Sequence, residues 1–124
     1  ISTDVCVPIS RLAECVDATR AEIDASGLIA PIVGHVGDGN FHCVILVDPN
    51  DPAEIERAED LNRRIVERAL AMGGTCTGEH GIGIGKQDFL LLEHGSEAVA
   101  TMRLIKQALD PDNLLNPGKV LPPP

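Results

Sequence analysis

Two short segments of the chain carry residues that could bind a metal ion or move a proton. Residues 34–42 read GHVGDGNFH and place His35 and His42 on either side of an Asp-Gly pair. Residues 78–81 read GEHG, and Glu79 and His80 stand there in a loop that holds six glycines between positions 73 and 85. Imidazole nitrogens and carboxylate oxygens are the usual ligands of catalytic zinc. The two segments are therefore candidate halves of one metal site.

The first segment is typical of a β-hairpin. Asp38-Gly39 predicts a two-residue type I′ turn, with His35 opposite His42 and with Val36 and Phe41 directed into the core. Directly opposed residues share a face of the sheet, with Cβ atoms about 4.5–5.5 Å apart, so both imidazoles could bind one cation. An ordinary hairpin with half-exposed histidines is the alternative that this segment alone leaves open.

The second segment supplies a carboxylate and a base. Because adjacent residues of an extended loop point to different sides, we expect Glu79 as the third metal ligand and His80 as a nearby catalytic base. Two histidines and one carboxylate leave open positions on zinc, manganese or iron, as catalytic sites require. The glycines fit neither the GxxxxGK phosphate loop nor the GxGxxG dinucleotide pattern. A solvated turn is the other interpretation of GEHG.

Composition excludes several other functions. The net charge of −9 disfavours nucleic acid and anionic membrane surfaces as partners. Two phenylalanines are the only aromatic residues, which leaves no platform for stacking bases. No apolar run is long enough for a transmembrane helix. The chain starts without Met, so we expect it to be the interior of a longer chain. The four scattered cysteines predict buried free thiols.

The elements that must position these residues alternate between strand and helix patterns. Strands are expected at 3–9, 28–36 and 41–48, and helices from Ser10 to Gly27, from Asp51-Pro52 to Gly73-Gly74, at 86–93 and at 96–109. This order predicts a single α+β domain. We expect a small antiparallel sheet with helices packed on one face: a ferredoxin-like core plus C-terminal helices.

Three motifs together resemble a known family. GHVGDGNFH, GTCTGEHGIGIGK and LDPDNLLNPGKVL occur in the order, and at the distances, of the C-terminal domain of FAD-linked oxidases of the D-lactate dehydrogenase and glycolate oxidase subunit type. The resemblance covers nearly the whole chain, and it looks closest to the cytochrome-type D-lactate dehydrogenases. It implies that residues 1–124 are the C-terminal substrate or cap domain, that an N-terminal FAD-binding domain is missing, and that this chain alone is inactive.

The resemblance also implies roles for individual residues. The metal would be bound by His35, His42 and Glu79, with His80 as the catalytic base. Asn40 and Asn116 would lie near the FAD. The parent protein would oxidise a D-2-hydroxy acid to the 2-oxo acid by hydride transfer to the flavin. Where related D-2-hydroxyglutarate dehydrogenases have an asparagine that meets the second carboxylate of the substrate, this chain has Val44, which favours a short or apolar substrate.

Further partners and alternatives follow from the same resemblance. A cytochrome or quinone would accept the electrons. The parent protein would be cytoplasmic or peripheral to the inner membrane in a bacterium, and mitochondrial in a eukaryote. A homodimer is compatible with the sequence. The alternatives are a glycolate oxidase subunit, a non-haem iron oxygenase, or a non-enzymatic regulatory or oligomerisation module in which the histidines are structural.

Overall fold

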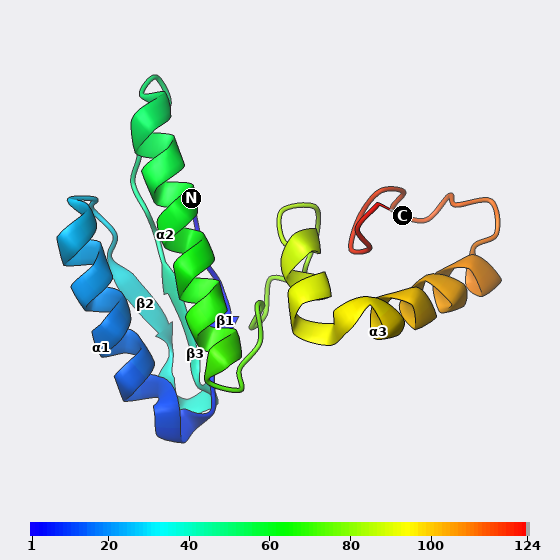
Figure 1. The fold of residues 1–124 in the computed structure, drawn as a ribbon, viewed down its shortest axis with the longest axis horizontal. Coiled ribbons are helices and arrows are strands. Elements are labelled where there is room, and N and C mark those ends of the chain that lie inside the picture. Colours follow the sequence, from blue (N-terminus) through cyan, green and yellow to red (C-terminus); the bar gives the residue numbers. More distant parts are fainter. Residues whose placement is uncertain (124) are drawn as a thin grey trace. The chain divides into compact units, whose positions relative to one another are not determined.

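The computed structural model describes residues 1–123. These residues form two compact units, one of residues 1–79 and one that begins at His80. The first unit contains β1 (Val5–Cys6), α1 (Ile9–Ser26), β2 (Ile32–His35), a 3₁₀ turn (Val36–Asp38), β3 (Asn40–Cys43) and α2 (Pro52–Ala71); the second contains α3 (Gln87–Leu109) (Figure 1). The mixed α+β class predicted from the sequence is confirmed.

One end of each helix in the first unit has a local cause: the C-terminal end of α1 and the N-terminal end of α2. Gly27 ends α1 in the left-handed conformation, at φ 72°, which glycine adopts without steric cost. The helix starts at Ile9, with Pro8 before it, rather than at the predicted Ser10 cap. Asp51 caps α2 by accepting hydrogen bonds from the backbone N–H groups of Ala53 and Glu54 at 2.9 and 3.2 Å.

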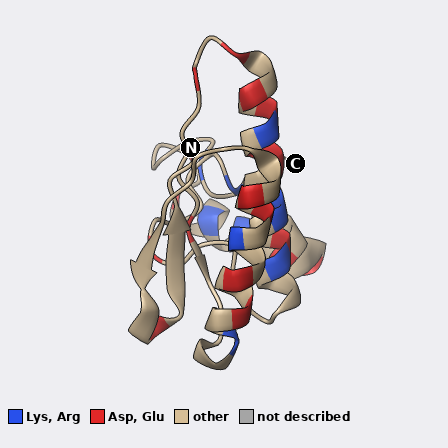
Figure 2. Cartoon of the chain, turned by 90° about the vertical axis from the view of Figure 1, so that its left-hand side faces the viewer, with Lys and Arg blue, Asp and Glu red and all other residues tan. Residues whose placement is uncertain are grey.

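The three strands form an antiparallel sheet in the order β1-β3-β2, with β3 in the centre. Both helices lie on one side of this sheet, as the view in Figure 2 shows. Apolar side chains fill the space between the layers. They come from β3 and the residues after it (Phe41, Cys43, Ile45), from α1 (Cys15, Ile23) and from α2 (Ala58, Leu61, Ile65, Val66, Ala69). Residues 41, 43 and 45 share the face of the sheet that packs against the helices, because successive side chains of a strand point to opposite faces.

The hairpin between β2 and β3 differs from the predicted one. Gly34 pairs with Phe41 and His35 pairs with Asn40, so the loop has four residues instead of two, and His35 does not oppose His42. The segment 36–38 forms a 3₁₀ turn that Gly39 ends at φ 75°. Val36 is therefore exposed rather than in the core, whereas Phe41 is buried as predicted.

The second unit consists of α3 and the segments around it. Gly95 interrupts α3 with φ 76° and ψ 168°, which confirms the prediction of two helices on either side of this residue. The C-terminal segment is held through its backbone: the side-chain amide of Gln87 donates to the carbonyls of Gly118 and Leu121, each at 2.9 Å. Asp110 accepts from the N–H groups of Leu114 and Leu115, also at 2.9 Å.

Within residues 1–123, no helix is both long enough and apolar enough to cross a lipid bilayer.

Candidate metal centre

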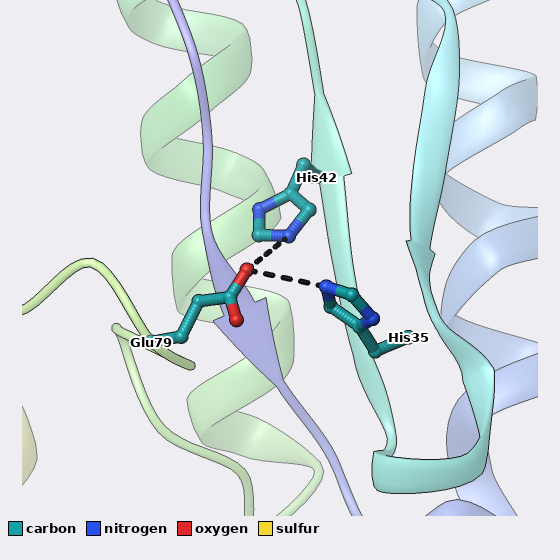
Figure 3. A group of neighbouring side chains, drawn as sticks. All are labelled: His35, His42 and Glu79. Carbon is teal, nitrogen blue, oxygen red and sulfur yellow. Dashed lines mark ion pairs between the residues drawn. The ribbon is translucent and has the colours of Figure 1, made fainter.

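The three predicted ligands meet on the open face of the sheet in the first unit. His35 ends β2, His42 lies within β3, and Glu79 follows the loop after α2. One carboxylate oxygen of Glu79, Oε1, lies 3.2 Å from His42 Nε2 and 3.5 Å from His35 Nε2 (Figure 3). The three candidate ligand atoms all lie within 4.8 Å of one another, and the described residues contain no other such group.

The longer hairpin loop still allows the two histidines to converge. Each strand residue faces the same side as the residue that it pairs with, so His35 shares a face with Asn40, and His42 lies two residues further along that face. Such diagonal neighbours are about 7–8 Å apart at the backbone, within reach of long side chains. Because the loop is longer by an even number of residues, the faces are the same as in the predicted hairpin.

The separations suit a bound divalent cation. With metal–ligand bonds of 2.0–2.1 Å at tetrahedral angles, two ligand atoms would be about 3.3 Å apart. The two histidine–glutamate distances, 3.2 and 3.5 Å, lie on either side of this value. The His35 and Glu79 side chains are 62% and 50% exposed, so the group opens toward solvent and could bind a small molecule as well as an ion. The donor set and its geometry therefore fit a metal.

A backbone carbonyl orients the ring of His42. Nδ1 of His42 lies 3.2 Å from the carbonyl oxygen of Thr3. A carbonyl can only accept a hydrogen bond, so we assign the proton of the neutral ring to Nδ1, which leaves the lone pair on Nε2. Nε2 is the nitrogen that faces Glu79. The ring is thus already in the tautomer that a metal ligand needs.

Cys43, next to His42 in the sequence, is not part of this group. Its side chain is fully buried in the core, on the opposite face of β3. Burial raises the pKa of the Cys43 thiol above its ordinary value of about 9, while the hydrogen bond with Thr3 opposes this effect. Cys43 and the buried Cys15 and Cys76 are free thiols, as the sequence predicted, and Cys6 is a free thiol of intermediate exposure.

Asn40, predicted to lie near the FAD, is mostly engaged within the first unit. Its side chain is buried, and Nδ2 donates to Asp4 Oδ1 at 2.9 Å and to the Val5 carbonyl at 3.0 Å. Its Oδ1 atom is buried without a hydrogen-bond partner among residues 1–123. Oδ1 is thus the atom of Asn40 with unused capacity to bind a donor.

The remaining two predicted site residues belong to the second unit. His80 is exposed and is its first residue. Asn116 is also exposed, at a left-handed φ of 48°, and its carbonyl accepts from the Lys119 N–H group at 3.2 Å. Asn116 and Lys119 line a pocket of about 540 Å³ inside this unit. The roles predicted for His80 and Asn116 stay predictions.

One residue near the centre was not singled out from the sequence. Asp4 is 1% exposed, and its Oδ1 atom lies 3.5 Å from His42 Nδ1. Its Oδ2 atom accepts from the backbone N–H group of Glu79 at 3.0 Å. The signal in the sequence was an aspartate directly before the apolar run VCVPI. A carboxylate that is buried with such a strand needs several hydrogen-bond donors.

Comparison with known proteins places the chain in a family. Residues 1–120 match the model of the C-terminal domain of FAD linked oxidases. The chain is 56% identical over 120 residues to a probable mitochondrial D-lactate dehydrogenase of Danio rerio, covering 97% of this chain and 24% of that protein. It is 51% identical over 121 residues to the mitochondrial D-lactate dehydrogenase [cytochrome] of Arabidopsis thaliana, covering 98% and 21%.

A bacterial relative is more distant. The glycolate oxidase subunit GlcD of Bacillus subtilis is 38% identical over 120 residues, which cover 97% of this chain and 26% of that protein. The chain therefore spans about a fifth to a quarter of the length of these relatives. The match to the family model extends over nearly all of its residues, and both segments that form the metal-ligand group lie inside it. This chain belongs to the family of FAD-linked oxidase C-terminal domains.

Proposed function

We propose that this chain is the substrate- and metal-binding part of an FAD-dependent dehydrogenase that oxidises a D-2-hydroxy acid, such as D-lactate, to the 2-oxo acid. The observation that carries the proposal is the convergence of His35, His42 and Glu79 within 4.8 Å, in a chain whose family implies FAD. These residues would hold a zinc, manganese or iron ion, because a set of two histidines and one carboxylate suits all three.

The residues of this chain would bind the substrate and take up its proton. When bound, the divalent cation would supply Lewis acidity at the substrate hydroxyl, and FAD would accept the hydride. His80, which follows Glu79 directly in the sequence, would accept the hydroxyl proton on a ring nitrogen. A neutral imidazole is suited to this role, because one of its ring nitrogens carries a lone pair that can accept a proton.

The surface next to the ligands suits a small apolar substituent. Val33 pairs with His42 across the strands and is 55% exposed. Val44 follows His42 by two residues, so it lies on the same face, and it is 39% exposed. The strands themselves contain no lysine, arginine, aspartate or glutamate, and in Figure 2 the charged residues of the first unit follow its helices and loops. The strands therefore offer no cationic side chain that would pair with a second carboxylate of the substrate.

FAD would be held mainly by an FAD-binding domain of the parent chain. From this chain, Asn40 and Asn116 would lie near the flavin. The unpartnered Oδ1 atom of Asn40 supports such a role, because a buried acceptor is stabilised by a donor from a ligand. We further propose that the first unit is a ferredoxin-like core, that a cytochrome accepts the electrons, and that the parent protein is mitochondrial if eukaryotic. A homodimer is the assembly that we would test first.

The test replaces the matching segment of the Danio rerio relative with this chain and assays the chimera. We expect metal-dependent oxidation of D-lactate, and none by the isolated 124-residue chain. Glu79→Gln should abolish activity and metal content, whereas Glu59→Gln, an exposed glutamate on α2, should change neither. Turnover of D-lactate by the isolated chain would contradict the domain assignment.

Glycolate oxidation is a second candidate, favoured by the similarity to the Bacillus subtilis subunit. The same chimera can be assayed with D-lactate, glycolate and D-2-hydroxyglutarate. A preference for D-lactate would support the role of Val33 and Val44, because glycolate lacks the methyl group that these side chains would contact. A preference for the dicarboxylate would refute the substrate proposal. A chimera without metal, and with full activity in His35→Ala, would support the non-enzymatic module.

A further inference from the structure

We infer that Asp4 is a positioning residue that holds His42 and Glu79 in place for the metal ion. The inference rests on the proposed metal site and extends it to a residue outside the ligand group. Asp4 directly precedes β1, whereas the ligands come from β2, β3 and the loop after α2. It therefore brings a fourth segment of the chain into the site.

The Asp4 carboxylate contacts both sides of the site. On one side, its Oδ1 atom accepts from Asn40 Nδ2 at 2.9 Å and lies 3.5 Å from His42 Nδ1. On the other side, its Oδ2 atom accepts from the loop that carries Glu79. The donors there are the Thr77 hydroxyl at 2.9 Å and the N–H groups of Gly78 and Glu79, each at 3.0 Å.

Four of these partners donate hydrogen bonds, and the fifth, His42 Nδ1, faces the carboxylate with an N–H group, which explains why a carboxylate stands here. The Nδ1 atom of His42 carries the ring proton because it also faces the Thr3 carbonyl. A carboxylate has two acceptor oxygens, one for each side. An asparagine could satisfy only one side, because its amide nitrogen would face donors on the other. Hydrogen bonds on both sides also offset the cost of burying a charge at 1% exposure.

These contacts fix the backbone of Glu79 and the ring orientation of His42. The Glu79 N–H group is held, so the Glu79 side chain extends from a constrained backbone. The His42 ring is held at Nδ1 by its hydrogen bond with the Thr3 carbonyl and by the nearby Asp4 carboxylate, which directs Nε2 toward Glu79. Gly78 adds to this arrangement: a Cβ atom there would lie 1.8 Å from Asn40 Nδ2, so the loop packs directly against the side chain that Asp4 binds. Groups that orient metal ligands typically change metal affinity 10–100-fold when removed.

The test measures Co²⁺ binding to the 124-residue chain by its visible absorption and by competition with a chelator. Asp4→Asn should weaken Co²⁺ binding by about 10–100-fold and alter the absorption spectrum of the bound ion. The matched control is Asp110→Asn, which removes another buried carboxylate that holds loop N–H groups, in the second unit. This control should lower thermal stability without changing the affinity or the spectrum.

The outcomes separate this inference from the proposed metal site. No Co²⁺ binding by the unsubstituted chain would refute both. Normal binding by the unsubstituted chain with equal affinity in Asp4→Asn would refute only the role of Asp4. If circular dichroism shows that Asp4→Asn is unfolded, Thr77→Val decides, because it removes one donor to Oδ2. We then expect a loss of up to about tenfold, relative to Thr101→Val on α3. Equal affinity in these two variants would overturn the inference.

Discussion

Gly34 offers a direct test of how the sheet positions the candidate metal ligands. A Cβ atom at this position would lie 2.5 Å from the Asn40 carbonyl oxygen and 2.6 Å from Phe41 Cα. Both are backbone atoms of β3, so no side chain can rotate to relieve the contact. In Gly34→Ala, β2 and β3 would have to separate by roughly 1 Å before the contact became ordinary. His35 is the next residue and would move with β2.

The expected magnitudes follow from this displacement. Overpacking of this kind typically costs about 1–3 kcal/mol. Replacing glycine by alanine also raises the free energy of unfolding by about 0.4–1 kcal/mol, because the unfolded chain loses conformational freedom. The net loss of roughly 1–2 kcal/mol corresponds to a fall in melting temperature of about 5–15 °C for a unit of this size. Because metal sites tolerate only about ±0.2 Å in ligand distance, we expect Co²⁺ affinity to fall about tenfold or more.

The assay combines thermal unfolding, followed by circular dichroism, with Co²⁺ titration. Gly37→Ala is the matched control: it lies in the same hairpin, and a Cβ atom there would contact nothing within 4 Å. The control should melt at the same temperature or slightly higher and should bind Co²⁺ normally. Equal melting temperatures for the two variants would refute the steric reasoning. A destabilised Gly34→Ala with unchanged affinity would show that the strand movement does not reach His35.

Three further predictions concern other parts of the chain. Asp51→Ala should lower the free energy of unfolding by about 0.5–2 kcal/mol in a denaturant titration, because the first turn of α2 loses the acceptor for two N–H groups; no change would show that the cap is dispensable. Burial raises the pKa of the Cys15 thiol above about 9, so stability should be complete below that pH and should fall as pH rises further, with a shallower fall in Cys15→Ala. The hydrogen bond from Lys106, followed by those from the Leu114 and Leu115 N–H groups, lowers the pKa of Asp110. Its contribution to stability should therefore be present above the unfolded-state pKa near 4 and be lost as pH falls through the lower folded-state value; identical acid unfolding of Asp110→Asn would contradict this.

Much of the architecture could be predicted from local patterns. The apolar spacing of residues 55–72 and the Asp51-Pro52 start predicted α2 because both signals act within a few turns of one helix. Gly27 and Gly95 predicted helix ends for the same reason, since glycine readily adopts the left-handed conformation seen at both positions. The β-branched-rich run at 41–48 predicted a strand, and β3 overlaps the start of this run. These features depend on neighbours in sequence, so a sequence contains them in full.

The hairpin shows where local signals are insufficient. Asp-Gly favours a two-residue turn, but this chain forms a four-residue loop in which His35 pairs with Asn40. Gly39 has to approach the main chain of Val7, since a Cβ atom there would lie 2.1 Å from the Val7 carbonyl oxygen. The Val7 N–H group also donates to the Gly39 carbonyl at 3.0 Å. The turn is thus docked on a segment more than 30 residues earlier, which no local pattern reports.

The candidate site likewise depends partly on the sequence and partly on the tertiary structure. The sequence by itself determined which ligand residues are available, namely His35, His42 and Glu79. It also determined that His35 and His42 lie on one face of the sheet, because the observed loop differs from the predicted one by an even number of residues. The tertiary structure decided that the three ligand atoms lie within 4.8 Å of one another, because Glu79 comes from a loop more than 35 residues after His42. It also decided the role inferred for Asp4, whose hydrogen-bond donors come from Asn40 of β3 and from that loop. Hydrogen bonds between distant segments depend on how those segments pack, and packing is a property of the folded chain as a whole.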